Sequence, residues 1–261
     1  MSPAADSAGQ PFEGRSFQSN PFQADTGEAD TALQSALDAF SQARTSSSPQ
    51  DVEEAFSRVV EAFSAARLLI PLIAEAGDFG LTPEGAIVEK SQELSVVHVE
   101  GPDGRAVAPV FSSVEAMSRW NSSARPVPVE AARAALATAA DGLALMVLDP
   151  GSPHTLTFRR GVLQAVARSE SYVSPLEDDQ VHSALSRAMD THRDTVVSWE
   201  VRSGDPSRTL SGPEVVVVLT LIPGLREEEL GSLLQEISGT WSEDAVLAAR
   251  VDGLGMKILQ A

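Results

Sequence analysis

The chain contains no cysteine, few aromatic residues and no long hydrophobic run, and each absence excludes a class of protein. Without cysteine, its 261 residues cannot form disulfide bonds, thiolate-ligated zinc sites, iron–sulfur clusters or a cysteine nucleophile. Aromatic residues make up only 5%, so a hydrophobic core must consist mainly of Ala, Val and Leu. The longest apolar candidate, Leu68–Ala74, is far shorter than the roughly 18–20 residues of a membrane-spanning helix.

Basic residues are also scarce. Nineteen Lys and Arg stand against 37 Asp and Glu, which gives a formal net charge of −18. This charge repels phosphate backbones and anionic lipid surfaces, so we expect neither a nucleic acid nor a membrane as partner. The first residues, Met1–Asp6, lack the basic and apolar regions of a signal peptide, and we expect a cytoplasmic protein.

Residues 1–50 are rich in Ser, Gln, Ala, Asp and Pro. A segment of this composition buries too little apolar surface to offset the loss of chain entropy, so we expect a largely disordered acidic tail. Residues 31–43 are an exception, because Leu33, Leu37 and Phe40 have helical spacing. This short helix is expected either to dock on the body of the protein or to fold on a partner.

Two domains are predicted after the tail, at residues 51–192 and 193–261. The fold class is α/β (α+β), with a mixed sheet and packed helices in the first domain and a smaller β-β-α-β-β arrangement in the second. In the first domain we expect helices at 52–63, 112–120, 130–140, 161–168 and 177–192, and strands at 68–73, 94–99, 105–111, 143–148 and 155–158. In the second we expect strands at 195–201, 215–221, 245–251 and 256–259 and a helix at 226–238.

Two local signals stand out in the first domain. Gly101–Gly104 has the composition of a tight hairpin turn. Ser112–Glu115 fits the Ser-x-x-Glu capping box that opens a helix, with Trp120 near the end of that helix.

The run from Gly101 to Trp120, with the hairpin turn, Pro-Val-Phe-Ser-Ser and the short helix ending in Trp, resembles the SseB N-terminal-domain family. The similarity continues through Ala124–Val129 and through Gly142–Pro150, and it covers roughly residues 51–175. Residues 195–261 resemble the C-terminal domain of that family more weakly. The resemblance implies an α/β fold in a cytoplasmic bacterial protein, and it implies no settled activity. Some relatives are associated with sulfurtransferases, but that chemistry needs a cysteine to carry the persulfide, and this chain has none.

The residues that carry the resemblance form the candidate interaction surface, which comprises Phe111, Ser112, Ser113, Trp120 and Arg125. One interpretation is a pocket for a partner, lined by the Phe-Ser-Ser segment and Trp120. The other is structural, with Phe111 ending a core strand and Trp120 packing its helix onto the sheet. Aromatic residues at the ends of elements are usually anchors, which favours the structural interpretation.

Other candidate sites are weak. Asp178 and His182 are spaced i,i+4, but a metal needs more convergent ligands than this pair supplies, so we predict no metal site. The Gly-x-Ser-x-Gly, Walker A and Gly-x-Gly-x-x-Gly patterns are all missing, so we predict no catalytic residues and no cofactor. The Arg159-Arg160 pair and the polar loop at residues 203–213, with Asp205 and Arg208, are expected to lie at the solvent-exposed surface.

These observations predict a non-catalytic protein that acts through a neutral or basic protein partner. Grooves at the domain junction would supply apolar anchors for that partner. The alternatives are a small-molecule binder or enzyme that uses a cleft near Phe111–Arg125, and an accessory factor in translation. A deep pocket with convergent polar groups near Phe111, Ser112, Ser113 and Arg125 would favour the first alternative, and a shallow, dry surface there would argue against it.

Overall fold

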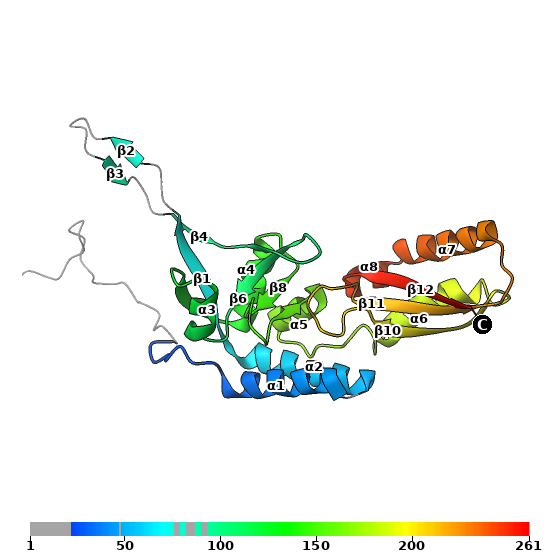
Figure 1. Cartoon of the computed structure of the whole chain (residues 1–261), viewed down its shortest axis with the longest axis horizontal. Coiled ribbons are helices and arrows are strands. Elements are labelled where there is room, and N and C mark those ends of the chain that lie inside the picture. The colour runs from blue at the N-terminus through cyan, green and yellow to red at the C-terminus, as the bar shows by residue number, and fades with distance from the viewer. Residues whose placement is uncertain (1–21, 47, 76–78, 82–86, 90–92, 261) are drawn as a thin grey trace, which may run out of the picture.

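The computed structural model describes residues 22–46, 48–75, 79–81, 87–89 and 93–260 (Figure 1). The expected disorder of residues 1–21 lies outside these ranges. Within them, no helix is both long enough and apolar enough to cross a membrane. Figure 1 shows an N-terminal body, from α1 to α5, followed along the long axis by a C-terminal body that contains α6 to α8.

The first helices form a pair on one side of the N-terminal body. Helix α1 (Thr31–Ser46) packs along α2 (Pro49–Ala65), and Leu33, Leu37 and Phe40 are buried in the core. Ser48 caps α2 through a capping box with Asp51. The helix expected at residues 31–43 is therefore docked on the body, the first of its two alternatives, and it begins at Thr31.

The central sheet of this body has the strand order β5-β6-β8-β9. Its strands are β5 (Val99–Glu100), β6 (Ala106–Val110), β8 (Met146–Leu148) and β9 (Leu156–Phe158). The β5–β6 hairpin confirms the turn at 101–104, and Gly104 has the positive φ of 80° that such a turn favours. Strands β6 and β8 run parallel, so their carboxyl ends meet at one edge.

A second sheet has the order β4-β1-β7, with β1 (Arg67–Glu75), β4 (Glu93–Val96) and β7 (Arg125–Glu130). A separate two-stranded ladder joins β2 (Phe79–Leu81) and β3 (Ile87–Glu89). The two larger sheets meet at one bridge, where the Leu69 and Phe111 backbones exchange hydrogen bonds of 2.8 and 2.9 Å. This bridge holds the start of β1 against the end of β6.

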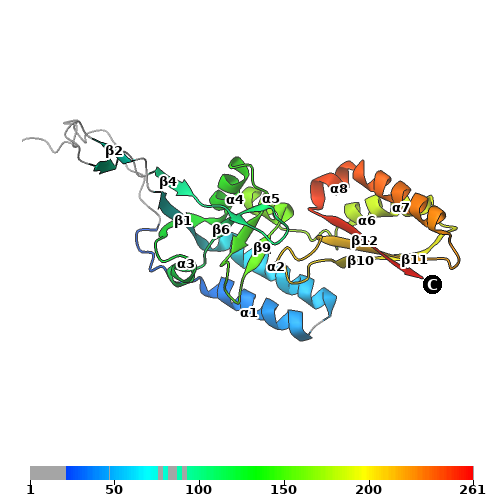
Figure 2. The same cartoon turned by 45° about the horizontal axis from the view of Figure 1, so that its top comes forward.

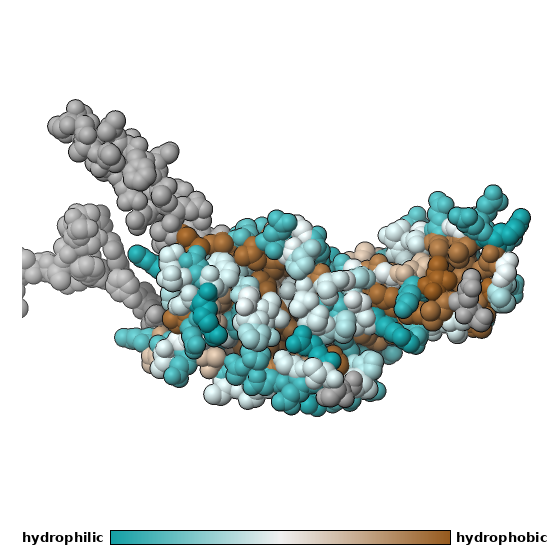
Figure 3. All heavy atoms as spheres, in the orientation of Figure 1, coloured by the Kyte–Doolittle hydropathy of each residue, from teal (hydrophilic) through white to brown (hydrophobic). Residues whose placement is uncertain are grey.

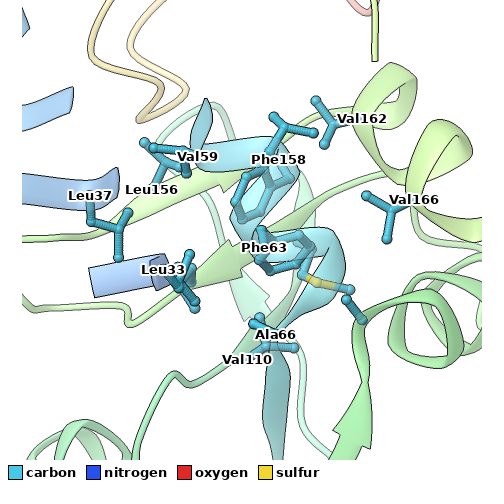
Figure 4. Packing of buried hydrophobic residues seen from close by; sticks show 14 of the residues in the cluster. Leu33, Leu37, Val59, Phe63, Ala66, Val110, Leu156, Phe158, Val162 and Val166 are labelled. Atoms are coloured by element: carbon cyan, nitrogen blue, oxygen red, sulfur yellow. The ribbon is translucent and has the colours of Figure 1, made fainter. Parts of the chain in front are cut away.

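Three further helices complete the body: α3 (Val114–Trp120), α4 (Ala131–Ala140) and α5 (Arg160–Arg168). The main core lies between α2 and the central sheet, where the Phe63 and Phe158 rings are 4.0 Å apart (Figure 4). Buried Val, Leu and Ala side chains surround these rings, as the composition predicts.

The C-terminal body has a sheet of order β10-β11-β12, with β10 (Val196–Ser203), β11 (Val215–Leu221) and β12 (Leu254–Gln260). Helices α6 (Asp179–Asp190), α7 (Glu227–Ser242) and α8 (Ala245–Arg250) pack on it and share its core. Figure 3 shows hydrophobic residues gathered over this sheet, beneath the hydrophilic outer surface of α7.

The α/β class is confirmed, but two details differ. Residues 245–251, expected as a strand, form α8, because Asp244 accepts hydrogen bonds from the Val246 and Leu247 N–H groups as an N-cap. The connection from β11 to the parallel β12 is therefore helical, as parallel pairs require. Helix α6 buries its apolar face in the C-terminal core, so the domain boundary lies before α6 and not at residue 192.

Two glycines inside α7 offer a test of the local energetics. A Cβ at Gly231 or Gly239 would meet no atom within 4 Å. Changing either residue to Ala is therefore expected to raise the free energy of unfolding by about 0.5–1 kcal/mol, measured by urea denaturation. Gly104→Ala is the control: its surroundings are equally open, but its φ of 80° should make this variant less stable. Equal effects in all three variants would contradict the prediction.

Candidate functional site

The aromatic pair of the predicted interaction surface is an internal anchor. Phe111 is completely buried, and its ring centroid lies 5.2 Å from that of the half-buried Trp120. Leu69 and Met117 pack in the same small cluster. This packing supports the structural interpretation, and it removes Phe111 from the surface that a partner could contact.

Ser112 and Asp149 meet at the carboxyl ends of the parallel strands β6 and β8. The Ser112 N–H donates to Asp149 Oδ1 at 2.8 Å, and the Ser112 hydroxyl donates to Oδ2 at 2.6 Å. Both residues are buried, and Asp149 has a positive φ of 47°. Burial raises the pKa of the Asp149 carboxyl despite these hydrogen bonds. Ligand sites of α/β sheets often lie at this edge, and strained residues often mark them.

The capping box expected to begin at Ser112 is displaced by one residue. Ser113 is the N-cap of α3, and its hydroxyl oxygen accepts a hydrogen bond from the Ala116 N–H at 3.1 Å. Ser112 is unable to serve there because its own side chain is directed to Asp149. The two adjacent serines therefore have different roles, which the Ser-x-x-Glu pattern does not distinguish.

A cavity of about 540 Å³ adjoins this pair. Its polar lining includes Ser112, Ser113, Arg119, Asp149 and His154. Residues 26–29 also line it, and Gln34 Nε2 of α1 lies 3.4 Å from His154 Nε2. A pocket with convergent polar groups therefore exists beside Ser112 and Ser113, two of the four residues near which the small-ligand alternative expects one.

Only part of the predicted surface belongs to this cavity. Ser112 and Ser113 line it, whereas Phe111, Trp120 and Arg125 do not. Arg125 is exposed at the start of β7, opposite Leu72 of β1. Sequence reasoning did not identify Asp149 or His154 as partners of the serines. One signal in the sequence could have indicated Asp149 as a site residue, because it directly follows a wholly apolar strand.

The buried Asp149 carboxyl gives a pH-dependent prediction. The pKa of Asp149 is raised in the folded protein, so the ionised carboxylate destabilises the fold. The free energy of unfolding therefore decreases as pH rises above 3.8, the ordinary pKa of the group. Asp149→Asn should therefore be more stable than wild type near neutral pH, since Asn carries no charge and tolerates positive φ. Urea denaturation over a pH series measures this difference, which should shrink as pH falls.

The histidine and acidic residues considered for a metal have other roles. Asp178 is the N-cap of α6, accepts from the Gln180 N–H at 2.8 Å and pairs with Arg250 at 2.6 Å. His182 Nε2 lies 2.7 Å from the Leu176 carbonyl oxygen. Across the described part of the chain, no group of three or more His, Asp or Glu side chains is arranged to hold a metal ion.

The expectation that Arg159 and Arg160 are a surface pair is wrong. The Arg159 side chain is 4% exposed and pairs with Asp205 at 2.8 Å and with Asp252 at 2.9 Å. Arg160 donates to the backbone carbonyls of Ala248 and Val251 at the end of α8. Both arginines therefore join the N-terminal body to the C-terminal body.

The loop at residues 203–213 also enters this junction instead of lying in solvent. Asp205 is fully buried and accepts hydrogen bonds from the Thr209 and Leu210 N–H groups. The buried Arg208 pairs with Glu53 of α2, and its carbonyl accepts from the Thr157 N–H of β9 at 2.7 Å. Sequence reasoning missed this arrangement because its charge pairs are distant along the chain.

Next to the buried ion pairs lies an open groove of about 820 Å³. It runs between the start of α2 and the strand β10. Apolar and charged side chains share its lining, which includes Val52, Leu176, Val201, Glu53, Glu177, Glu200 and Arg202. Among the described residues Glu177 forms no ion pair, while Glu200 pairs with the exposed Arg202.

These features define an α/β protein with two main hydrophobic cores, whose N-terminal and C-terminal bodies meet at a buried ionic junction flanked by a groove. A family model described as the SseB protein N-terminal domain matches residues 33–165, which is more than half of the chain. The chain belongs to this family, as its motifs predict.

The match begins at Leu33, a buried residue of α1, so α1 is part of the family domain. It ends at residue 165, and the similarity of residues 195–261 to the family's C-terminal domain stays a prediction. Neither a curated protein nor a solved structure matches the chain.

Proposed function

We propose that this SseB-family protein acts in the cytoplasm without catalysis, by binding a neutral or basic protein partner in the groove at its domain junction. The observation that carries this proposal is the combination of surfaces in that groove. The half-buried Leu176 and Val201 offer apolar contacts, and the exposed Glu177 provides negative charge beside them, next to the Glu200–Arg202 ion pair. Apolar anchors with a charged rim are the usual composition of a protein interface.

The charge of the whole chain favours the same kind of partner. A net charge of −18 attracts basic surfaces over distances near the Debye length and repels acidic ones. Binding of this kind gains much of its association rate from electrostatic steering, so it weakens as salt is raised.

Affinity purification with groove variants tests the proposal. Wild type and the double variant Glu177→Arg, Glu200→Arg are compared at low and high salt. The control is Glu61→Arg, Glu243→Arg, which makes an equal charge change at exposed positions on α2 and at the end of α7. A partner identified by mass spectrometry should be retained by wild type and control and lost by the groove variant. The proposal is contradicted if the groove and control variants retain the same proteins, or if wild type retains none at either salt concentration.

A second candidate function is the binding of a small polar ligand in the cavity beside Ser112 and Asp149. The supporting observation is the convergence of Arg119, His154 and Asp149 on one partly open pocket of about 540 Å³, a usual size for a ligand pocket. A thermal-shift screen of small metabolites tests it. A compound that stabilises wild type but not Arg119→Ala supports this function, and a screen without such a compound argues against it.

A further inference from the structure

The strand β10 is an edge strand beside the groove. Among the described residues it pairs only with β11, so no strand covers its outer backbone edge. Its burial differs from that of β11: Val197 is 57% exposed, whereas β11 is largely buried. In both Figure 1 and Figure 2 the start of α2 lies near this edge, which places the groove between them.

The groove follows the edge of β10 and not one face of the sheet. Four consecutive residues, 200–203, line it. Successive side chains of a strand point to opposite faces, so a groove that touches all four runs along the strand. A free strand edge inside a groove can accept an extended segment that forms backbone hydrogen bonds with it.

We infer that the groove binds an extended basic segment of a partner protein, which adds to the outer edge of β10 as a further strand. This inference rests on the proposed function and specifies the mode of binding. Alternate residues of the segment would place Lys or Arg beside Glu177 and Glu200, and the residues between them would contact Val201 and Leu176.

Charge decides between a basic segment and a second copy of the chain. A second β10 would bring Glu200 together with Arg202, which pairs with it, so the strand itself adds no net charge. The repulsion comes from the whole chain, because each copy carries a net charge of −18, so pairing of two copies is unfavourable. Charged residues and the irregular register between Val196 and Ser198 are typical protections of an edge against self-association. A basic strand meets the exposed Glu177 and the negative charge of the whole chain with the opposite charge.

The test uses the full-length protein and three synthetic peptides as long as the eight-residue β10. The first peptide alternates Lys with Val. The second has the same sequence with alternate backbone amides methylated, which removes donors and keeps the charge. The third alternates Glu with Val. Affinity is measured by fluorescence anisotropy, and hydrogen exchange reports protection of the backbone amides at residues 197–202.

The first peptide should bind and protect the β10 amides, the methylated peptide should bind about tenfold or more weakly, and the acidic peptide should not bind. The variant Glu177→Gln, Glu200→Gln should weaken binding of the first peptide severalfold, whereas Glu61→Gln, Glu243→Gln should not.

Equal binding of the plain and methylated peptides overturns strand addition but leaves a groove that binds basic segments. No binding of the first peptide also overturns the inference, while the purification experiment still decides the proposed function independently. Protection of amides that lie only outside β10 also overturns strand addition.

Discussion

Replacing Asp205 with Ala is expected to lower the free energy of unfolding by about 3–5 kcal/mol, because the change leaves a buried arginine without one of its two carboxylates. Arg159 donates to Asp205 at 2.8 Å, and both side chains are inaccessible to solvent or nearly so. The same carboxylate accepts the Leu210 N–H at 2.8 Å and the Ser211 hydroxyl at 2.8 Å. The variant therefore loses both an ion pair and the hydrogen bonds that shape the loop. Urea denaturation measures the loss.

Asp103→Ala is the matched control. Asp103 also accepts a hydrogen bond from an arginine, Arg105, at 2.7 Å, but its side chain is 29% exposed and Arg105 retains Asp252. Exposed pairs contribute about 0–1 kcal/mol, so this variant should lose little stability. Similar losses in the two variants would show that the buried junction does not contribute as the geometry indicates.

The Asp205 effect has a defined pH dependence. Burial alone would raise the pKa of Asp205, but the hydrogen bonds from Arg159, Ser211 and the loop N–H groups outweigh burial and lower it. A lowered pKa contributes stability that is complete above the ordinary value of 3.8 and is lost as pH falls through the folded value. The stability difference between wild type and Asp205→Ala should therefore shrink in acid.

The elements that the sequence predicts correctly are those whose signals are local. Helix α2 follows from apolar residues at helical spacing, and Val52, Phe56 and Phe63 are indeed all buried. The β5–β6 hairpin follows from its turn residues, because only a few residue types favour that backbone. Helix α8 was missed although its N-cap, Asp244, is visible in the sequence, because Val246 and Val251 favour a strand when read alone.

The junction was missed for a different reason. Arg208 pairs with Glu53, and Arg159 pairs with Asp252, across long stretches of chain. A charged residue in a polar loop normally lies in solvent, and only the packing of two bodies makes its burial favourable. The same limit applies to the candidate site. The sequence pointed to Ser112, but the pairing with Asp149 depends on the parallel arrangement of β6 and β8, which no local pattern encodes.

Phe56→Ala should also lower the free energy of unfolding by about 3–5 kcal/mol, since it removes a buried aromatic side chain from the main core. Phe56 also contacts the junction. The guanidinium carbon of Arg208, which comes from the junction loop, lies 4.4 Å from the centre of the Phe56 ring. Phe56 therefore connects the core of the N-terminal body with the buried ion pairs of the junction.

A double-mutant cycle separates these two roles. Phe56→Ala and Arg208→Gln should show a coupling energy of about 1–2 kcal/mol, because a buried cation on an aromatic ring is stabilised by about that amount. Phe40→Ala is the control: its ring centroid is 5.7 Å from that of Phe56 and it is equally buried, so it should lose comparable stability. Its coupling to Arg208→Gln should be near zero. Equal coupling for both phenylalanines would mean that Arg208 senses the core as a whole and not the Phe56 ring.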